Sequence, residues 1–170
     1  IAAGGHVRAY DPVITALPGA VNCVNEADAA RTAGLILSVN TGGAALSVFQ
    51  AAADHVAAGA VWADMNTTAP TLKRRLSTLA SVRGVAFADI AIMGAVAGRG
   101  LATPLLASGD GAARAAMMLG AYGAYAEVLD GPAGAAAERK LLRSVFYKGM
   151  SAAVVEALAA ARALGLEDWL

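Results

Sequence analysis

A run of basic and hydroxyl side chains in the last quarter of the chain has the residue types of an anion-binding catalytic face. The run GPAGAAAERKLLRSVFYKGM covers residues 131–150. At about 100° per residue, one arc of a helix here collects polar side chains only. They are Lys140, Arg143, Ser144, Tyr147, Lys148 and Ser151. An exposed helix face usually mixes acids with bases, and this arc holds no acid, so it suits an anionic ligand. Plain solvent exposure is the alternative interpretation.

Lys140 is the residue of this arc that we expect to act as general acid/base. An amine on such a face can take a proton from a hydroxyl group of a bound ligand and return it in the reverse direction. A lysine can do both when burial and neighbouring positive charge make it easier to deprotonate. Lys148, two helical turns further on, is the competing candidate. We favour Lys140 because it lies nearer the predicted domain boundary.

Asp11 ends the first predicted strand, where the sequence HVRAY precedes it. If the first strand of a dinucleotide-binding fold lies before this sequence, the strand that Asp11 ends is the second one. An acid at the end of that second strand accepts hydrogen bonds from the adenosine ribose and would repel a 2′-phosphate. This position predicts NAD as cofactor, with NADP still possible. An Asp-Pro pair is also a common turn opener, and the two interpretations stay open.

Polar residues also follow the third and fourth predicted strands. Val39 is the last residue of the third strand, Asn40 and Thr41 follow it and precede two glycines, and Thr67 follows the fourth strand. In an open parallel sheet these positions lie at the carboxyl edge, where a nucleotide binds. We therefore predict that the four residues contact the cofactor. Capping of the next helix is the alternative for the hydroxyl and amide side chains.

The scaffold is predicted from short apolar runs that alternate with alanine-rich helical runs. The predicted strands cover residues 6–10, 21–24, 35–39, 60–64, 85–93, 103–108 and 124–129. The clearest helices cover residues 44–57, 70–81 and 135–164, and another follows residue 110. This alternation indicates an α/β fold with a Rossmann-type, doubly wound, mostly parallel sheet, followed by a long helix.

Two domains are expected. Residues 1–131 form a dinucleotide-binding domain that lacks its first strand, and residues 132–170 form an interdomain helix and the start of an all-α domain. The first strand and its G-x-G-x-x-G turn should precede His6, and residues 1–5 would be the end of the first helix. We therefore expect the sequence to be cut at its N-terminal end. Because it stops at Trp169-Leu170, directly after a helix stop, we expect a cut at the C-terminal end as well.

Composition excludes several classes of function. Hydrophobic residues make up 58% of the chain, yet much of this is alanine, and no run reaches the roughly 20 residues of a membrane span. Thirteen bases balance thirteen acids, so neither nucleic acid nor a membrane surface is expected as partner. His6 and His55 stand alone, and no metal site is predicted. The single cysteine, Cys23, is expected to be buried in a strand, and a cytoplasmic protein is predicted.

Four stretches, in order, resemble the β-hydroxyacid dehydrogenase group of the 6-phosphogluconate dehydrogenase superfamily. GGHVRAYD resembles the second strand of the family's cofactor domain, and DMNTTAP resembles its D-x-S-T-x-x-P segment. ADIAIMGAVAGRGLATPLLASG stands where the family has its D-A-P-V-S-G-G substrate stretch. AAERKLLRSVFYKG stands where it has the catalytic-lysine helix. The resemblance implies an NAD-binding domain and the start of a short C-terminal domain.

The resemblance also assigns roles to residues. It places Lys140 at the catalytic lysine, Thr67 at the threonine that contacts the cofactor, and Gly94 at the first glycine of the substrate stretch. Met93 replaces the serine that binds the substrate carboxylate, and Ala95 replaces the second glycine.

One further departure from the family pattern lies on the catalytic helix. Ser144 stands where the family has an asparagine, one helical turn after the lysine. Arg99 or Arg143 could supply the anion contact that the methionine of the substrate stretch cannot. Lys148, the competing candidate for the catalytic role, is otherwise expected to contact the substrate.

Together these observations predict an NAD(P)-dependent oxidoreductase that transfers a hydride between a nicotinamide cofactor and a small hydroxy acid, a carboxylate. The alternative is a catalytically silent Rossmann-type nucleotide-binding protein that has lost its site. Imine reduction, in which the lysine is normally replaced, is disfavoured. Val154, Val155 and Leu158 have too little chain after them to be covered internally, so we expect this face to meet another subunit, as in a homodimer, or further C-terminal helices.

Overall fold

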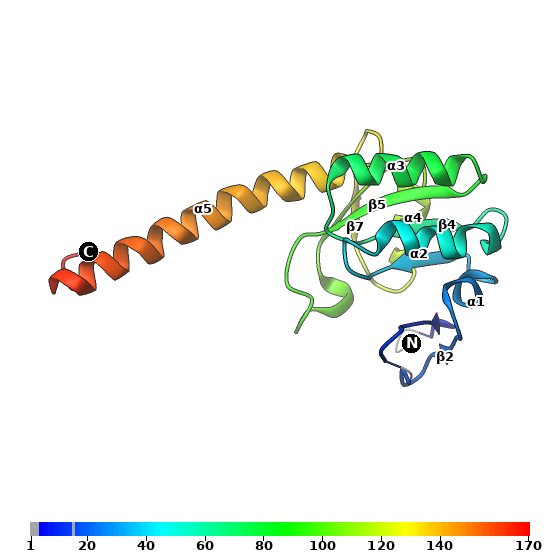
Figure 1. Ribbon diagram of the computed structural model, residues 1–170, viewed down its shortest axis with the longest axis horizontal. Helices are drawn as coiled ribbons and strands as arrows, with labels where there is room; N and C mark the ends of the chain where they lie inside the picture. Colours follow the sequence, from blue (N-terminus) through cyan, green and yellow to red (C-terminus); the bar gives the residue numbers. More distant parts are fainter. Residues whose placement is uncertain (1–3, 15) are drawn as a thin grey trace. The chain divides into compact units, whose positions relative to one another are not determined.

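A computed structural model describes residues 4–14 and 16–170 (Figure 1). Residues 1–3, which belong to the predicted end of a first helix, lie outside the described part. The chain forms two compact units, residues 1–138 and residues 139–170.

The first unit is built on a five-stranded sheet whose strands lie in chain order. They are β3 (Leu35–Ser38), β4 (Val61–Asp64), β5 (Ala86–Ile92), β6 (Leu105–Ser108) and β7 (Ala126–Val128). Neighbouring strands run parallel except β5 and β6, which are antiparallel. The predicted mostly parallel α/β sheet is therefore confirmed, and the predicted strands extend beyond the observed ones by one or more residues.

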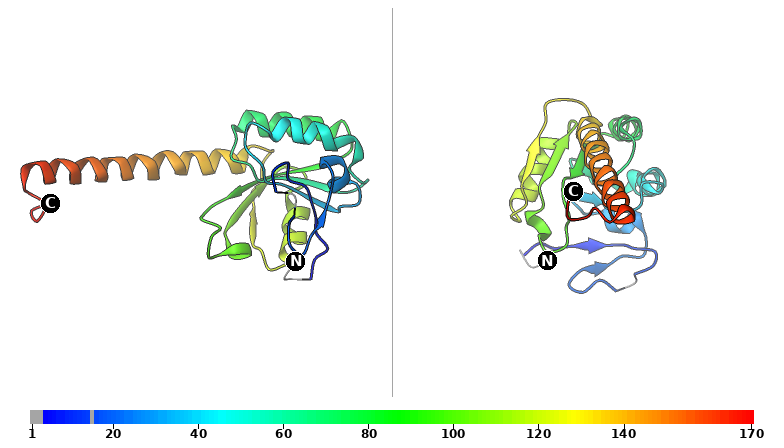
Figure 2. Two further views of the ribbon diagram at one scale, coloured as in Figure 1. Left: turned by 60° about the horizontal axis from the view of Figure 1, so that its bottom comes forward. Right: turned by 90° about the vertical axis from the view of Figure 1, so that its left-hand side faces the viewer.

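Helices cover both faces of this sheet. On one face lie α2 (Ala45–Ala52), the short 3₁₀ helix η1 (Ala53–His55) and α3 (Pro70–Ser81), while α4 (Ala112–Gly120) lies on the other (Figure 2). Side chains alternate along β4, so Trp62 packs with Phe49 and Leu76 in one core, and Val61 packs with Ile90 in the other. The prediction of a helix at residues 70–81 is confirmed, because α3 has the same bounds.

The first two strands form a separate sheet, which differs from the single sheet that was expected. β1 (Arg8–Ala9) pairs in parallel with β2 (Val21–Asn22). An ion pair of 2.6 Å joins Arg8 to Asp28 in α1 (Glu26–Ala30). Cys23 follows β2 and is half-buried, so its predicted burial in a strand is wrong: this small sheet has little chain packed over it.

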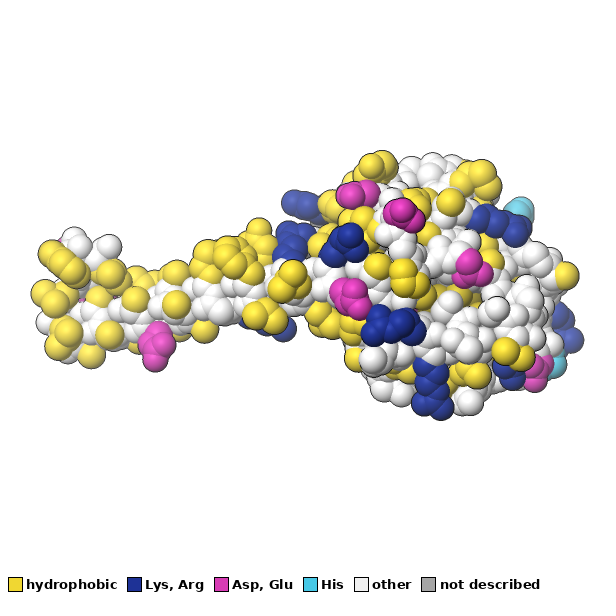
Figure 3. Space-filling model, turned by 90° about the horizontal axis from the view of Figure 1, so that it is seen from above, with side chains coloured by type: hydrophobic (Ala, Val, Ile, Leu, Met, Phe, Trp, Pro, Cys, Tyr) yellow, Lys and Arg dark blue, Asp and Glu magenta, His cyan; other side chains and the backbone are white. Residues whose placement is uncertain are grey.

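The long helix α5 (Ala135–Leu164) has the predicted bounds. Its first turn belongs to the first unit and the rest to the second. Hydrophobic side chains are spread along it (Figure 3), and Leu142, Val145 and Phe146 are more than half exposed. Among the described helices, none is long and apolar enough to cross a membrane.

Candidate functional site

The loops that follow β3 and β4 meet at one edge of the sheet. Ser38 and Asp64, the last residues of these parallel strands, are direct partners in the ladder. A Cβ atom on Gly42 would lie 2.9 Å from the carbonyl oxygen of Thr67, so only a glycine allows the two loops to approach this closely. The structure therefore brings the predicted cofactor residues Asn40 and Thr67 to the same edge.

These residues do not cap the following helices. The N-cap of α2 is Ala44 and that of α3 is Ala69, and neither makes a side-chain cap hydrogen bond. Thr41 and Thr67 therefore do not occupy the N-cap positions. Both threonines are exposed at the carboxyl edge, and so is Val39.

A small amide network lies beneath this edge. The Asn40 and Asn66 side-chain nitrogens both donate to Ser38 Oγ at 3.1 Å, and the Asn66 nitrogen also donates to Asp64 Oδ2 at 3.1 Å. Within residues 4–14 and 16–170, Asn40 Oδ1, Asn66 Oδ1 and Thr68 Oγ1 are buried without a hydrogen-bond partner. Buried polar atoms are normally paired, so three unpaired ones in adjoining segments indicate that a ligand or water completes the site.

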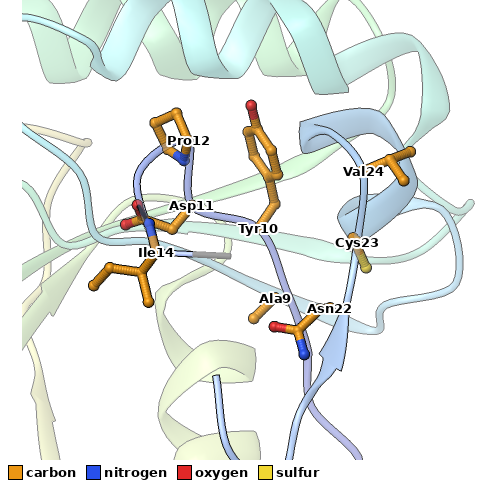
Figure 4. Close-up of a pocket in the computed structure, with 8 residues that line it drawn as sticks. All are labelled: Ala9, Tyr10, Asp11, Pro12, Ile14, Asn22, Cys23 and Val24. Atoms are coloured by element: carbon orange, nitrogen blue, oxygen red, sulfur yellow. Dashed lines mark hydrogen bonds between the residues drawn. The ribbon is translucent and has the colours of Figure 1, made fainter. Parts of the chain in front are cut away.

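Asp11 lies where β1 ends, in a pocket lined by residues that follow both short strands (Figure 4). Its Oδ1 atom accepts hydrogen bonds of 2.8 Å from the backbone N–H groups of Val13 and Ile14. The N–H of Ile14, followed by that of Val13, holds the pKa of Asp11 below its ordinary value. The turn interpretation is confirmed, and the carboxylate is ionised at neutral pH, as the ribose interpretation also requires.

The predicted substrate residues Met93, Gly94 and Ala95 follow β5, which runs parallel to β4 and ends at the same edge. Met93 is half-buried, while Gly94 and Ala95 are exposed. Arg99 sits between Gly98 and Gly100, which have φ of +78° and +52°, values that glycine adopts without strain.

Arg99 returns toward the start of this stretch. Its Nη1 atom would lie 3.9 Å from a Cβ atom built on Gly94. The structure therefore brings the guanidinium next to the glycine of the predicted substrate stretch.

The predicted catalytic arc lies on α5, in the second unit. Lys140 and Ser144 are half-buried one turn apart, whereas Lys148 is exposed. The Arg143 guanidinium lies 5.1 Å from the centre of the Tyr147 ring, a cation–π contact.

A buried charge cluster beneath the sheet edge was missed by the sequence analysis. Lys73 Nζ lies 2.6 Å from Asp64 Oδ1 and 3.1 Å from Asp89 Oδ1, and all three side chains are at most 1% exposed. Lys73 also donates to the Asp64 carbonyl oxygen at 2.8 Å. The sequence does carry a signal for this cluster, because Asp64 and Asp89 lie inside strands that are otherwise apolar. Buried charges need partners, so a basic residue near them was to be expected.

This cluster continues into the first turn of α5. Asp89 Oδ2 accepts hydrogen bonds of 3.0 Å from the backbone N–H groups of Gly134 and Ala137. Ser108 Oγ accepts one of 3.1 Å from Ala136 and donates one of 3.3 Å to Asp89 Oδ2.

Comparison with known proteins identifies related folds. The model of a family described as the NAD-binding domain of 6-phosphogluconate dehydrogenase matches residues 4–138. No curated protein matches the chain.

Three similar solved structures illustrate the likeness. A conserved protein of unknown function, described as structurally similar to 3-hydroxyacid dehydrogenases, is 36% identical over 81% of this chain and 52% of its own, with a TM-score of 0.70. A 3-hydroxyisobutyrate dehydrogenase from Mycobacterium tuberculosis, solved with L-serine, is 24% identical over 97% of this chain and 60% of its own, with a TM-score of 0.83. A reductive aminase from Aspergillus terreus, solved with NADPH and ethyl levulinate, is 24% identical over 86% and 52%, with a TM-score of 0.75. At 24% identity, these last two show the shared fold alone.

The coverages also show that this chain spans little more than half the length of the three proteins.

Proposed function

The chain belongs to the family of the NAD-binding domain of 6-phosphogluconate dehydrogenase, and on this premise we propose that it serves an NAD(P)-dependent oxidoreductase acting on a small hydroxy acid. The predicted cofactor, NAD, agrees with the family. The hydroxy-acid substrate and the site residues are part of the proposal.

The carboxyl edge of the sheet fits a dinucleotide. Asn66 and Thr68 present buried oxygen atoms without partners there, and Gly42 keeps the neighbouring loops close. We assign Val39, Asn40, Thr41 and Thr67 to this cofactor. When bound, its nicotinamide ring accepts or supplies the hydride.

Asp11 extends the same assignment to the other end of the cofactor. Its ionised carboxylate would accept hydrogen bonds from the ribose hydroxyls, and it would repel a 2′-phosphate. The pocket at the ends of β1 and β2 supports this role.

The chain's own residues would supply binding and proton transfer. Lys140 would take the substrate hydroxyl proton during oxidation and return it to the carbonyl oxygen during reduction. Arg99 would hold the substrate carboxylate in place of a hydroxyl that Met93 lacks, because a guanidinium binds a carboxylate through two hydrogen bonds. Its approach to Gly94 supports this assignment. Arg143, Ser144, Lys148 and Ala95 are the remaining expected contacts.

The observation that carries the proposal is the set of unpaired polar atoms at the carboxyl edge of a sheet of this family. The test is oxidation of NADH and NADPH by the full-length protein with 2-keto acids, 3-keto acids and semialdehyde acids. We expect turnover with one acid class, and faster turnover with NADH. Cofactor binding without turnover across the panel would favour the catalytically silent alternative.

A further inference from the structure

Asp89 stands at the centre of the buried charge cluster, between the sheet and α5. One of its carboxylate oxygens faces Lys73 at 3.1 Å, and the other accepts the N–H groups of Gly134 and Ala137. The side chain is fully buried. A single residue of β5 thus joins α3 to the first turn of α5.

The charges of the cluster do not balance among its side chains. Asp64 and Asp89 carry two negative charges, and Lys73 carries one positive charge. The start of a helix carries a partial positive charge and unpaired N–H groups. The first turn of α5 therefore compensates the surplus carboxylate, and the carboxylate in turn holds this turn against the sheet.

The start of α5 differs from those of the other helices of eight or more residues. The N-caps of α2, α3 and α4 make no side-chain cap hydrogen bond. The first turn of α5 instead receives side-chain acceptors from strands β5 and β6, at least 28 positions earlier in the chain. These contacts join the first turn of α5 to strands that are themselves packed in the core.

Lys140 follows this anchored turn on the same helix, three residues after Ala137. We propose that Asp89 and Ser108 are positioning residues for Lys140, because they fix the turn of α5 from which the amine projects. This inference rests on the proposed function. Proton transfer requires reacting atoms at hydrogen-bond distance, so a small shift of the helix start costs turnover rather than cofactor binding.

Two substitutions weaken the anchor without removing Lys140. In Asp89→Asn, the single carbonyl oxygen can face Lys73 or α5 but not both. Ser108→Ala removes only the acceptor of the Ala136 N–H and one donor to Asp89. We expect kcat to fall about 100-fold in the first variant and about tenfold in the second, with the KM for NADH within about twofold.

Two control variants separate positioning from stability. Glu138→Gln removes the exposed contact of the same helix turn with Arg74, and Phe49→Leu weakens the core on the α2 face of the sheet. Both should retain kcat. A loss in Phe49→Leu as large as in Asp89→Asn would overturn the proposal, because the effect would then follow stability alone.

Amide hydrogen exchange tests the anchor without any turnover. The N–H groups of Ala136 and Ala137 should exchange about tenfold faster in Asp89→Asn than in the wild type, since their hydrogen bonds are weakened. Unchanged exchange, or faster exchange with unchanged kcat, would overturn the proposal. A wild type that binds NADH but turns over no acid would refute the proposed function, and the exchange rates would still decide whether Asp89 anchors α5.

Discussion

At the scale of single residues, the proposed reaction depends on one amine. Lys140 and Lys148 lie on the same helix, and the first is half-buried while the second is exposed. A half-buried amine can face a bound ligand on its covered side, as a proton-transfer role requires. The pair offers a matched comparison, because the two side chains are chemically identical.

We predict that Lys140→Ala lowers kcat by about 10²- to 10⁴-fold and leaves NADH affinity largely unchanged, because only proton transfer is lost. Lys148→Ala should retain most of the activity. Steady-state kinetics and NADH fluorescence titration measure the two quantities. The reverse pattern, with Lys140→Ala active and Lys148→Ala inactive, would transfer the catalytic role to Lys148.

Asp11 offers a second prediction at this scale. Asp11→Ser removes the charge that repels a 2′-phosphate, so the preference for NADPH over NADH should rise by roughly tenfold. The ratio of kcat/KM values for the two cofactors measures it. Asp28→Ser, which removes the half-buried ion pair with Arg8, is the control and should leave the ratio unchanged. An unaltered ratio in Asp11→Ser would mean that Asp11 stabilises its turn and does not select the cofactor.

At the scale of elements, the buried cluster joins β4, β5, α3 and α5. Lys73→Met leaves Asp64 and Asp89 buried without their counter-charge, and we expect the free energy of unfolding to fall by about 3–5 kcal/mol. Urea unfolding followed by circular dichroism measures this.

The matched control for this prediction is an exposed ion pair of the same unit. Arg83→Gln breaks the contact of 2.8 Å with Asp54, whose side chain is 73% exposed, and should cost less than about 1 kcal/mol. Equal losses in Lys73→Met and Arg83→Gln would mean that the cluster does not stabilise the fold.

The loop contact between β3 and β4 yields another element-scale prediction. In Gly42→Ala the new methyl group would lie 2.9 Å from the Thr67 carbonyl oxygen, so the loops must separate, at a cost of about 1–3 kcal/mol in unfolding free energy. In Gly43→Ala the methyl group meets no atom within 4 Å, and the change should stay within about 0.5 kcal/mol. Thermal unfolding of both variants gives the comparison. Equal stability would show that the loops are not in close contact.

At the scale of the whole molecule, we propose a homodimer that covers the apolar residues of α5. Val154, Val155 and Leu158 are 53%, 66% and 52% exposed. We expect the protein to sediment as a dimer and Leu158→Glu to sediment as a monomer, because burial of a charge in an apolar interface is unfavourable. Glu156→Gln on the same helix should remain dimeric. A monomeric wild type in sedimentation velocity would contradict the homodimer.

The cytoplasmic location of the protein stays a prediction.

Local patterns in the sequence determined the elements and their order. The helix at residues 70–81 begins with a proline in its first turn and ends as predicted, and α5 has its predicted bounds, because helix periodicity and end signals lie within the element itself. The position of Asn40 and Thr67 at the same sheet edge was also predictable, since parallel strands end at the same edge.

Tertiary structure alone decided the features that depend on distant partners. The separation of β1 and β2 from the main sheet and the antiparallel direction of β6 depend on which strands become neighbours. The contacts among Lys73, Asp64 and Asp89, and the hold of Asp89 on α5, join residues up to 48 positions apart. No local periodicity encodes such a contact, because the attraction that stabilises it acts between groups from distant parts of the chain and must offset the cost of removing them from water.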